Sequence, residues 1–319
     1  MSSGDLGQRG QQPLEAVFGD RLQRQVPLAR FTSSRIGGPA DYLLPVRSRD
    51  ELAEVAAELW ELEVAFRMLG GGSNVLVADA GYRGVIVLNQ ARAVRFVDDS
   101  QPSVWAESGA SLGSLGRRTV ARGLAGLTWA ATVPGTVGGA VAGNAGAHNG
   151  DTAGSLKVAE ILQHAEGVQQ WTPERLAFGY RTSWLKEHPG QAVVLSATFA
   201  LQSGDPEQLA AEMETFVDHR RLTQPPGASW GSMFKNPPGD HAGRLIDTAG
   251  LKGLRIGGAE VSQLHANFFV NTGQATAADA WALLTEVQRR VKETHGVELE
   301  LEIERLGEWD GPTMNRAAG

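Results

Sequence analysis

The 319-residue sequence contains no cysteine. That absence excludes disulfide bonds, thiolate nucleophiles, iron–sulfur clusters and cysteine-ligated zinc. Positive charge is also sparse, because 29 Lys and Arg stand against 36 Asp and Glu and the net charge is −7. A surface that wraps nucleic acid needs dense positive charge. We therefore expect no nucleic-acid partner, and we expect no metal site.

The usual nucleotide-binding fingerprints are missing as well. No Gly-x-Gly-x-x-Gly motif follows a strand-like run, and no glycine is followed by Lys-Ser or Lys-Thr. Neither a Rossmann site nor a P-loop is therefore supported. A dinucleotide, if one binds, must be held by another architecture.

Charged side chains are absent from residues 123–150, which contain no Asp, Glu, Lys or Arg. A bilayer is spanned by about 20 apolar residues, but several glycines and Pro134 interrupt this segment. A lipid-exposed span needs an unbroken helix, since hydrocarbon satisfies no open backbone group. We interpret the segment as a buried wall around a large ligand. Residues 1–13 show no secretion signal, so we expect a cytoplasmic protein without membrane insertion.

Glycine, by contrast, is abundant. The chain has 40 glycines, whereas an average content of about 7% would give about 22. The excess gathers at residues 37–38, 70–72, 135–146 and 257–258. Such clusters are typical of tight turns or of backbone that closely approaches a ligand.

The length exceeds the ~100–200 residues of an ordinary domain, so we expect two or three lobes. Apolar spacing predicts a helix after a capping box at 48–51, a helix over 209–217 that continues into 219–221, and a helix that starts at Thr276. Strand-like runs cover 84–88, 192–201 and 268–271. Residues 297–304 alternate apolar residues with glutamates, which predicts a half-buried strand. The mixture favours α+β lobes with a joint near 203–206.

Two glycine-rich loops are candidates for cofactor binding. The first, at 69–74, follows the apolar run 64–68, and its three glycines free backbone N–H groups to converge on an anion such as a pyrophosphate. The second, at 134–147, has small side chains that would let a flat aromatic cofactor lie against the backbone. A flexible turn and a packed structural turn are the respective alternatives. The candidate cofactor-binding residues are Gly70, Gly71, Gly72, Ser73, Asn74, Pro134, Gly135, Thr136, Gly138, Gly139, Asn144 and Gly146.

Eight segments, in the same order along the chain, closely resemble the bacterial UDP-N-acetylenolpyruvoylglucosamine reductases. One glycine loop would be weak support, but eight ordered motifs make coincidence a poor explanation. The segments extend from near Pro27 to Gly307. They are Arg35–Asp41, Gly70–Asn74, Pro134–Ala147, Tyr180–Ser183, Gly231–Pro237, Ala249–Gly253, His265–Phe268 and Leu299–Gly307.

The resemblance implies an α+β protein in which a two-subdomain FAD-binding fold of the vanillyl-alcohol-oxidase / p-cresol-methylhydroxylase type precedes a C-terminal substrate-binding domain. We expect FAD-binding subdomains at 20–90 and 91–203 and the substrate-binding domain at 204–309, with the last strand returning to the first subdomain. Flexible tails are expected at 1–19 and 310–319. We expect a monomer.

The resemblance also implies a reaction. NADPH would reduce a non-covalently held FAD, although the sequence itself does not separate NADPH from NADH. The enolpyruvyl ether of UDP-N-acetylglucosamine would then take hydride at its methylene carbon and a proton at the adjacent carbon. The product would be UDP-N-acetylmuramate, a precursor of peptidoglycan.

Three catalytic residues follow from the motif positions. Arg181 would hold the substrate carboxylate as charge accumulates, a task suited to a planar, permanently charged group. Ser232 would donate the proton, and Glu302 would polarise the carboxyl group or position a proton relay. From the residues alone Ser229 rivals Ser232. Only the spacing to Gly307 separates Glu302 from its neighbours, Glu298, Glu300 and Glu304.

Substrate contacts are expected from Arg220, opposite the diphosphate with Arg221 as its rival, and from Asn236 and Gln263. His265 is better interpreted as a packed, hydrogen-bonded histidine. Only 50 residues separate Arg181 from Ser232, without a tyrosine, whereas many family members carry there a loop whose tyrosine closes over the uridine. The chain thus resembles a shorter branch.

A second departure is His148-Asn149, which replaces a more usual Tyr-Gly in the second loop. Two other functions remain open from the sequence. One is a different FAD enzyme of the same fold, such as an oxidase of alcohols or sugars. The other is a non-enzymatic protein that binds nucleotide sugars.

Overall fold

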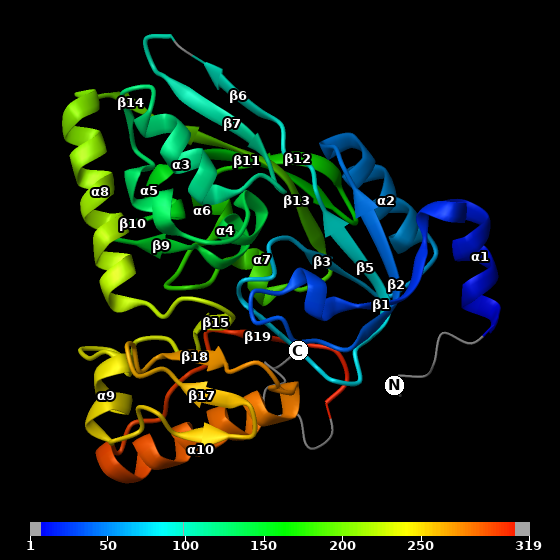
Figure 1. The fold of residues 1–319 in the computed structure, drawn as a ribbon. Coiled ribbons are helices and arrows are strands. Elements are labelled where there is room, and N and C mark those ends of the chain that lie inside the picture. Colours follow the sequence, from blue (N-terminus) through cyan, green and yellow to red (C-terminus); the bar gives the residue numbers. More distant parts are fainter. Residues whose placement is uncertain (1–7, 98, 310–319) are drawn as a thin grey trace.

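The computed structural model describes residues 8–97 and 99–309. The first lobe contains a four-stranded sheet in the order β1-β2-β5-β3, in which β5 pairs in parallel with both β2 and β3. Figure 1 shows α2 packed beside this sheet. The elements are α1 (Gln8–Phe18), β1 (Gln23–Pro27), β2 (Pro39–Val46), α2 (Arg49–Glu61), β3 (Phe66–Leu69), β4 (Val75–Val77) and β5 (Tyr82–Asn89).

The helix α2 forms where the apolar spacing predicts it. Its buried face consists of residues at helical spacing, Leu52, Val55, Ala56 and Leu59. Ser48 caps the helix, because its Oγ accepts a hydrogen bond from Glu51 N at 3.2 Å. The predicted capping box is only half formed, since the Glu51 carboxylate turns to Arg47 N, 2.6 Å away.

The second lobe contains a five-stranded sheet in the order β12-β11-β13-β7-β6. Its core includes Trp171 and Phe199 together with the apolar residues of α3 and α4. The uncharged segment 123–150 forms short helices and a hairpin in this lobe. The main elements are β6 (Val94–Val97), β7 (Ser103–Glu107), α3 (Leu112–Val120), α4 (Val137–Gly143), β9 (Gly146–Ala147), β10 (Gly150–Asp151), β11 (Leu156–Gln163), β12 (Gly167–Trp171), α7 (Trp184–Glu187) and β13 (Ala192–Ala200).

Smaller elements complete the second lobe. The strands β8 (Leu124–Ala125) and β14 (Gln202–Ser203) pair with each other. The other short elements are the 3-10 helix η3 (Thr128–Thr132), α5 (Thr152–Ser155) and α6 (Pro173–Leu176). No helix in the described part of the chain is long and apolar enough to cross a membrane.

The long helix α8 packs along the second lobe, against η3 and α3, and leads into a third lobe that lies at the bottom of Figure 1. Its sheet has the order β15-β18-β17-β16, and α10 supplies much of its core. The helix α10 begins after Thr276, as predicted, and Thr276 and Asp279 form a complete capping box at its start. The elements are α8 (Pro206–Thr223), β15 (Ser229–Ser232), α9 (Ala242–Thr248), β16 (Arg255–Ile256), β17 (Ala259–Val261), β18 (Phe268–Asn271), α10 (Ala277–His295) and β19 (Glu304–Leu306).

The first and third lobes are joined through backbone groups. β19 pairs in parallel with β4 of the first lobe. The Asp79 carboxylate accepts hydrogen bonds from Ala277 N and Ala278 N at 2.8 and 2.9 Å, so a residue of the first lobe satisfies N–H groups that α10 cannot satisfy itself. The chain order and packing thus bring β19, late in the described residues, back beside β4 of the first lobe. The expected domain boundaries stay a prediction.

Two sequence-based expectations differ from the structure. A flexible tail was expected over residues 1–19, but α1 covers Gln8–Phe18 and buries Leu14 and Phe18 in the core of the first lobe. Their apolar side chains, four residues apart, share one helical face. Residues 1–7 and the expected tail at 310–319 lie outside the described residues.

The predicted strand over 297–304 is also wrong in extent. Only Glu304–Leu306 forms a strand, although Leu299 and Ile303 are buried as the alternation predicted. The preceding residues pair irregularly with the segment after β15, through Lys235 N to Glu300 O at 2.8 Å and Glu302 N to Met233 O at 2.9 Å. The segment changes partners as it passes between lobes, which prevents a regular ladder.

Candidate active site

The two glycine loops, which come from different lobes, touch each other. A Cβ atom added to Gly70 would lie 2.5 Å from Thr136 Oγ1, and one added to Gly71 would lie 3.1 Å from Gly135 Cα. On Gly135, which has φ of +102°, it would lie 2.8 Å from Ser73 Oγ. Side chains at these positions would force the loops apart, so the glycines are needed for the approach.

A cavity of about 270 Å³ lies beside Gly70 and Gly71. Two arginines, Arg30 and Arg92, line it, and no carboxylate does, so the cavity suits an anionic group. Sequence reasoning missed these arginines because the segments that carry them show neither a motif nor an unusual composition. The lining residues are Arg30, Phe31, Thr32, Ser33, Gly70, Gly71, Leu88, Asn89, Gln90 and Arg92.

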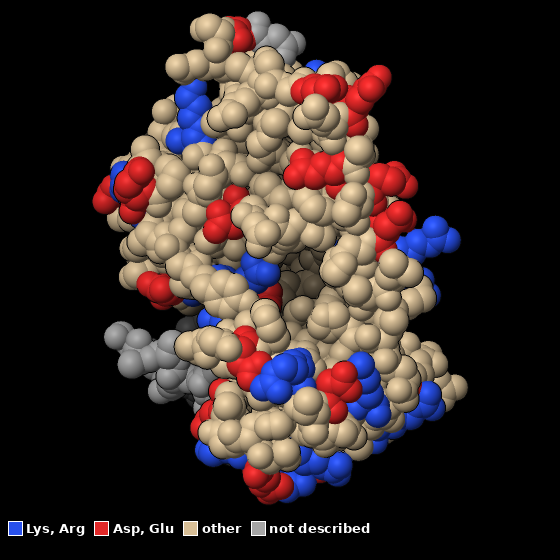
Figure 2. Space-filling model, turned by 90° about the vertical axis from the view of Figure 1, so that its left-hand side faces the viewer, with Lys and Arg blue, Asp and Glu red and all other residues tan. Residues whose placement is uncertain are grey.

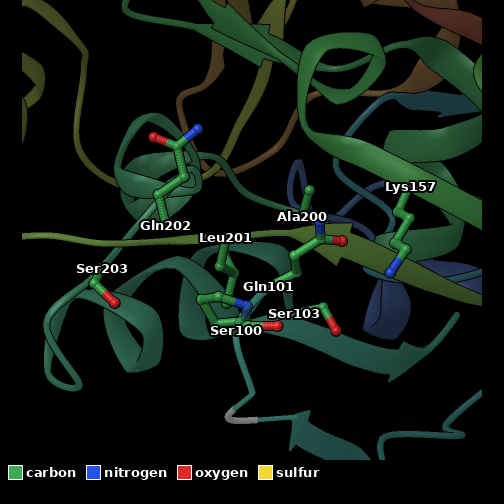
Figure 3. A pocket seen from close by; sticks show the side chains of 9 residues that line it. Ser100, Gln101, Ser103, Lys157, Ala200, Leu201, Gln202 and Ser203 are labelled. Atoms are coloured by element: carbon green, nitrogen blue, oxygen red, sulfur yellow. The ribbon is translucent and has the colours of Figure 1, made fainter.

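A larger cavity, of about 480 Å³, lies in the second lobe (Figure 3). None of the predicted site residues lines it. Its only charged lining residue is Lys157, beside serines, glutamines and the end of β13. This cavity lacks the grouped chemistry of the glycine loops, and we assign it no role.

The side chain of Asn144 is used within the protein. Asn144 is buried, its Nδ2 donates to Gly179 O at 3.0 Å, and its Oδ1 accepts from Ala153 N at 3.0 Å. Its backbone carbonyl faces Arg181 Nη1 at 3.5 Å. Asn144 therefore connects the second glycine loop to the turn that carries Arg181. Gly146 does the same, since its carbonyl accepts from Arg181 Nη2 at 2.9 Å.

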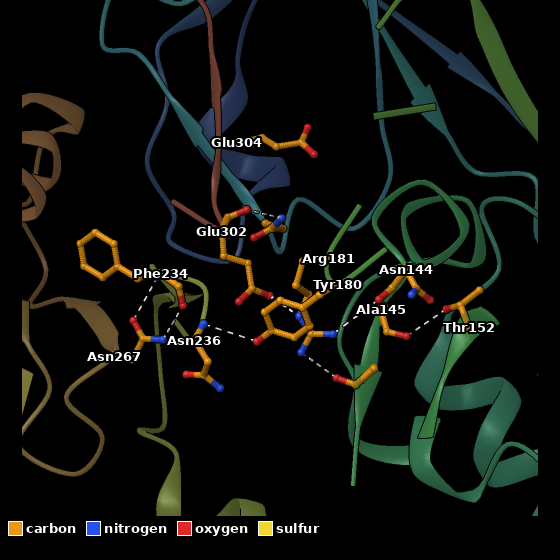
Figure 4. A network of polar contacts seen from close by, with 12 residues as sticks. Asn144, Ala145, Thr152, Tyr180, Arg181, Phe234, Asn236, Asn267, Glu302 and Glu304 are labelled. Carbon is orange, nitrogen blue, oxygen red and sulfur yellow. Dashed lines mark hydrogen bonds and ion pairs between the residues drawn. The ribbon is translucent and has the colours of Figure 1, made fainter. Parts of the chain in front are cut away.

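Arg181 and Glu302 face each other across the seam between the second and third lobes (Figure 4). Arg181 Nε lies 2.8 Å from Glu302 Oε1. The Nε–H group nevertheless has no partner in hydrogen-bond geometry, so the contact is an ion pair rather than a directed hydrogen bond. The two residues are 121 positions apart in the sequence, and only the fold brings them together.

Burial separates Glu302 from the other three glutamates. The glutamate row, Glu298, Glu300, Glu302 and Glu304, meets Lys292, Lys235, Arg181 and Lys186 respectively. The Glu302 side chain is 18% exposed, whereas the others are 77%, 69% and 55% exposed for Glu298, Glu300 and Glu304. Burial raises the pKa of Glu302 above its ordinary value, although the positive charges of Arg181, Lys186 and Lys235 oppose the rise.

Ser232 lies at the end of β15, where it pairs with Phe268. The next residue, Met233, accepts the Glu302 N–H at 2.9 Å. A Cβ atom on Gly231 would lie 3.8 Å from Ser73 O, and Asn74 Nδ2 donates to Glu302 O at 3.2 Å. The serine strand, the glutamate segment and the first glycine loop therefore converge. Figure 2 shows the molecule hollowed between its upper and lower parts.

The remaining predicted contacts lie around this centre. Arg220 is partly buried and donates to Thr132 O at 2.6 Å, whereas Arg221 is exposed. Asn236 N donates to the Tyr180 hydroxyl at 3.4 Å, while Asn236 Oδ1 accepts from Ala242 N at 3.1 Å at the start of α9. The Gln263 side chain is exposed and lies against Gly253.

Two histidines are packed rather than free. His265 Nδ1 accepts from Asn267 N at 3.2 Å, and its ring lies against Phe268. Burial lowers the pKa of His265, and the charge of Lys252 adds to the effect. His148 stacks on Phe216 of α8 with ring centroids 4.0 Å apart. His148, one of the two residues at the end of the second glycine loop that depart from the family pattern, therefore links this loop to α8.

Comparison with known proteins agrees with this geometry. Residues 40–170 match the family model of an FAD binding domain, and residues 222–306 match that of the C-terminal domain of UDP-N-acetylenolpyruvoylglucosamine reductase. The reductase of Rubrobacter xylanophilus is 48% identical over 88% of this chain and 94% of its own length. The chain belongs to the UDP-N-acetylenolpyruvoylglucosamine reductase family.

Other relatives support the assignment. The reductase of Chloroflexus aurantiacus is 43% identical over 87% of this chain and 95% of its own length. The crystal structure of the reductase from Thermus caldophilus superposes with a TM-score of 0.76, at 38% identity, and covers 90% of this chain and 99% of that one. The predicted family, the α+β fold with its FAD-binding half, and the nature of the protein as an FAD-dependent oxidoreductase are confirmed.

Proposed function

We propose that this chain uses NADPH to reduce the enolpyruvyl ether of UDP-N-acetylglucosamine to UDP-N-acetylmuramate in the bacterial cytoplasm, as a step of peptidoglycan precursor synthesis. The observation that carries the proposal is the Arg181–Glu302 pair, 2.8 Å apart at the junction of the glycine loops and the Ser232 strand. The names of the relatives support the substrate class. The second glycine loop and Arg181 belong to the same lobe, so cofactor and substrate would meet there.

The residues present fit a non-covalently held FAD. The contact between Gly70–Gly71 and Gly135–Thr136 leaves backbone on both sides of the junction, and a side chain there would fill it. Arg30 and Arg92 line the adjoining cavity, which suits the anionic pyrophosphate of a dinucleotide. The chain has no cysteine for a thioether link. When bound, FAD would supply the hydride that is transferred between NADPH and the substrate.

Arg181 would bind the substrate carboxylate. Its guanidinium is already oriented by the carbonyls of Asn144 and Gly146, so little reorganisation would be needed when charge develops on that carboxylate. Glu302 lies next to it. Because burial raises the pKa of Glu302, this carboxyl takes a proton more readily than an exposed one, and a protonated carboxyl can donate a hydrogen bond to the developing enolate.

Ser232 would deliver the proton to the substrate carbon. A serine hydroxyl is a weak acid, so nearby groups must stabilise the oxyanion that it leaves. Lys235 follows three residues later, and its ammonium lies 2.5 Å from Glu300 Oε1. Arg220, half-buried where α8 meets Thr132, would face the diphosphate, with Asn236 and Gln263 as further polar contacts of the sugar nucleotide.

A two-step spectroscopic experiment tests the function. The purified protein should be yellow, NADPH should bleach the flavin absorbance, and the enolpyruvyl sugar nucleotide should restore it. Ser232→Ala should leave the bleaching step unchanged and slow the reoxidation step by about 10²–10⁴-fold, the usual loss when a general acid is removed. Reoxidation of the variant at the wild-type rate would show that Ser232 is not the donor. Bleaching without reoxidation in the wild type would refute the proposed substrate.

A further inference from the structure

The backbone of Arg181 adopts a conformation that arginine rarely takes. Its φ is +58°, in the left-handed region that favours glycine or asparagine. Arg181 and Tyr180 are the central residues of a tight reversal, closed by hydrogen bonds in both directions between Gly179 and Thr182 at 3.1 and 3.3 Å. Such strain persists only where the surroundings hold the residue in place.

Two side chains hold this turn by its carbonyl groups. Asn144 Nδ2 donates to Gly179 O at 3.0 Å, and Lys186 Nζ donates to Arg181 O at 3.4 Å. Lys186 is itself well placed, because it belongs to α7, which begins beside the fully buried Ser183. The Ser183 hydroxyl donates to Ala142 O of α4 at 2.6 Å. The carbonyl of the strained residue is thus held by a lysine from its own lobe.

The same ammonium group also reaches the third lobe. Lys186 Nζ lies 3.4 Å from Glu304 Oε1, and Glu304 N donates to Asn74 O in the first glycine loop at 3.1 Å. Glu304 lies two residues after Glu302 along the same segment (Figure 4). One side chain therefore connects the Arg181 turn to the segment that carries the buried carboxylate.

The positive charge of Lys186 also acts on Glu302. Three cations act on Glu302: Arg181 in direct contact, Lys186, and Lys235. The neighbouring Glu300 and Glu304 are paired with Lys235 and Lys186 respectively. The Lys186 side chain is 23% exposed, so solvent screens its field less than that of a surface lysine. Its removal should leave Glu302 facing one cation fewer.

We propose that Lys186 is a positioning residue, which holds the strained Arg181 turn by its carbonyl group and, through Glu304, ties this turn to the segment that carries Glu302. The kinetic part of its test rests on the function proposed above. Lys186 does not need to touch the substrate, and it acts through Arg181 and Glu302.

The test compares Lys186→Met with Lys292→Met in the FAD-loaded protein. Lys292 pairs with Glu298, the outermost and most exposed glutamate of the same row, so both changes remove one cation from that row. Lys186→Met should slow flavin reoxidation by the enolpyruvyl sugar nucleotide by about 10–100-fold, since small misplacements of reacting groups cost rates of this order. Flavin reduction by NADPH should change by less than about 2-fold, and Lys292→Met should match the wild type in both steps.

A second readout needs no substrate. Titration of the Glu302 carboxyl by carbon NMR in glutamate-labelled protein should give a higher pKa in Lys186→Met than in the wild type, and an unchanged pKa in Lys292→Met. Lys186→Gln, which keeps an N–H donor without the charge, should show the same pKa rise with a smaller loss of rate. It also serves as the test variant if Lys186→Met does not fold.

Three results would overturn the proposal: reoxidation at the wild-type rate, an equal slowing of flavin reduction, or an unchanged Glu302 titration. Failure of the proposed function would look different. In that case the wild type itself would not be reoxidised by the sugar nucleotide, while the NMR comparison of Lys186→Met with Lys292→Met would still apply.

Discussion

Two of the arginine–glutamate pairs that join lobes within the described residues differ in the direction in which the pKa of the glutamate is shifted. Arg49 and Glu160 link α2 of the first lobe to β11 of the second, at 2.9 Å, with side chains that are 29% and 23% exposed. Arg181 and Glu302 link the second lobe to the third, at 2.8 Å, with side chains that are 25% and 18% exposed. The pKa of Glu160 is lowered, whereas the pKa of Glu302 is raised.

The geometry of the hydrogen bonds explains the difference. Burial raises the pKa of Glu160 too, but Arg49 donates to both of its oxygens, at 3.1 and 2.9 Å, and the Ser196 hydroxyl donates a third hydrogen bond. For Glu302, burial has the largest effect on the pKa and outweighs the three cations and the contact with Arg181, whose Nε–H is not aligned with the carboxylate. Charged hydrogen bonds offset the cost of burial, whereas proximity alone does not.

The two pairs therefore suit different tasks. Glu160 is held ionised in a network that includes Trp105, whose indole N–H donates to Ser196 Oγ at 3.0 Å, and through Arg49 this network links the first lobe to the second. At the second pair, the buried Nε of Arg181 is left without a hydrogen-bond partner beside Glu302, and the Arg181 backbone is strained. Incomplete satisfaction costs stability and is typical of a functional site, where a ligand supplies the missing partner.

The largest expected effect concerns activity. Glu302→Gln should slow reoxidation of the reduced flavin by the enolpyruvyl sugar nucleotide by about 10²–10⁴-fold, because it removes a proton-transferring group. Glu298→Gln and Glu300→Gln, which change exposed members of the same row, should remain within about 2-fold of the wild type. Stopped-flow kinetics would measure this, and equal losses in all three variants would show that Glu302 has no special role.

The second effect concerns stability, and here the change at Glu160 should matter more than the change at Glu302. Glu160→Gln should lower the free energy of unfolding by about 1.5–3 kcal/mol at neutral pH, the value of hydrogen bonds to a charged group. Glu302→Gln should change it by less than about 1 kcal/mol and could increase it, because a buried charge with poor hydrogen bonds is removed. Urea denaturation at saturating FAD would compare the two, and a larger loss in Glu302→Gln would contradict the contrast between the pairs.

The sequence predicts the local helices and the candidate residues of the site better than it predicts how these residues are arranged in space. Local signals, such as the apolar spacing of α2 and of the helix that follows Thr276, identified helices correctly because they involve residues a few positions apart. The ordered motifs gave the family and hence Arg181, Ser232 and Glu302 as candidates, whose roles stay predictions. The sequence alone could not distinguish the four glutamates from one another. Their difference in burial depends on Arg181, which lies more than 100 positions away.

Other features had no signal in the sequence. Arg30 and Arg92 line a cavity only because strands β2 and β5 bring distant loops together. Lys186 looked like any lysine of a short helix, and its contact with Glu304 spans 118 positions. The closing segment was expected to be a strand from its alternation. It instead divides its hydrogen bonds between Met233, Lys235 and Asn74, a change of partner that periodicity does not encode.

The smallest expected effect is the dependence of stability on pH, and it tests the sign of each shift. For Glu160 the folded-state pKa is lowered, so the wild type should exceed Glu160→Gln in stability above the ordinary glutamate value of about 4.3. This advantage should disappear as the pH falls through the folded-state pKa. For Glu302 the folded-state pKa is raised, so the folded protein binds the proton more tightly than the unfolded chain does. The wild type should therefore lose stability relative to Glu302→Gln as the pH rises from about 4.3 through the folded-state pKa.

The two difference curves should thus change on opposite sides of the ordinary glutamate value of about 4.3, the Glu160 curve at lower pH and the Glu302 curve at higher pH, and with opposite slopes. Unfolding midpoints in urea, measured at several pH values at constant ionic strength, would give both curves. Salt should be held fixed because screening weakens partly exposed pairs, and added salt should reduce the Glu160 difference more slowly than that of a surface pair such as Arg289–Glu293. Curves of the same sign would mean that Arg181 stabilises ionised Glu302 as fully as Arg49 stabilises Glu160. The missing hydrogen-bond alignment at Arg181 Nε would then have no energetic consequence.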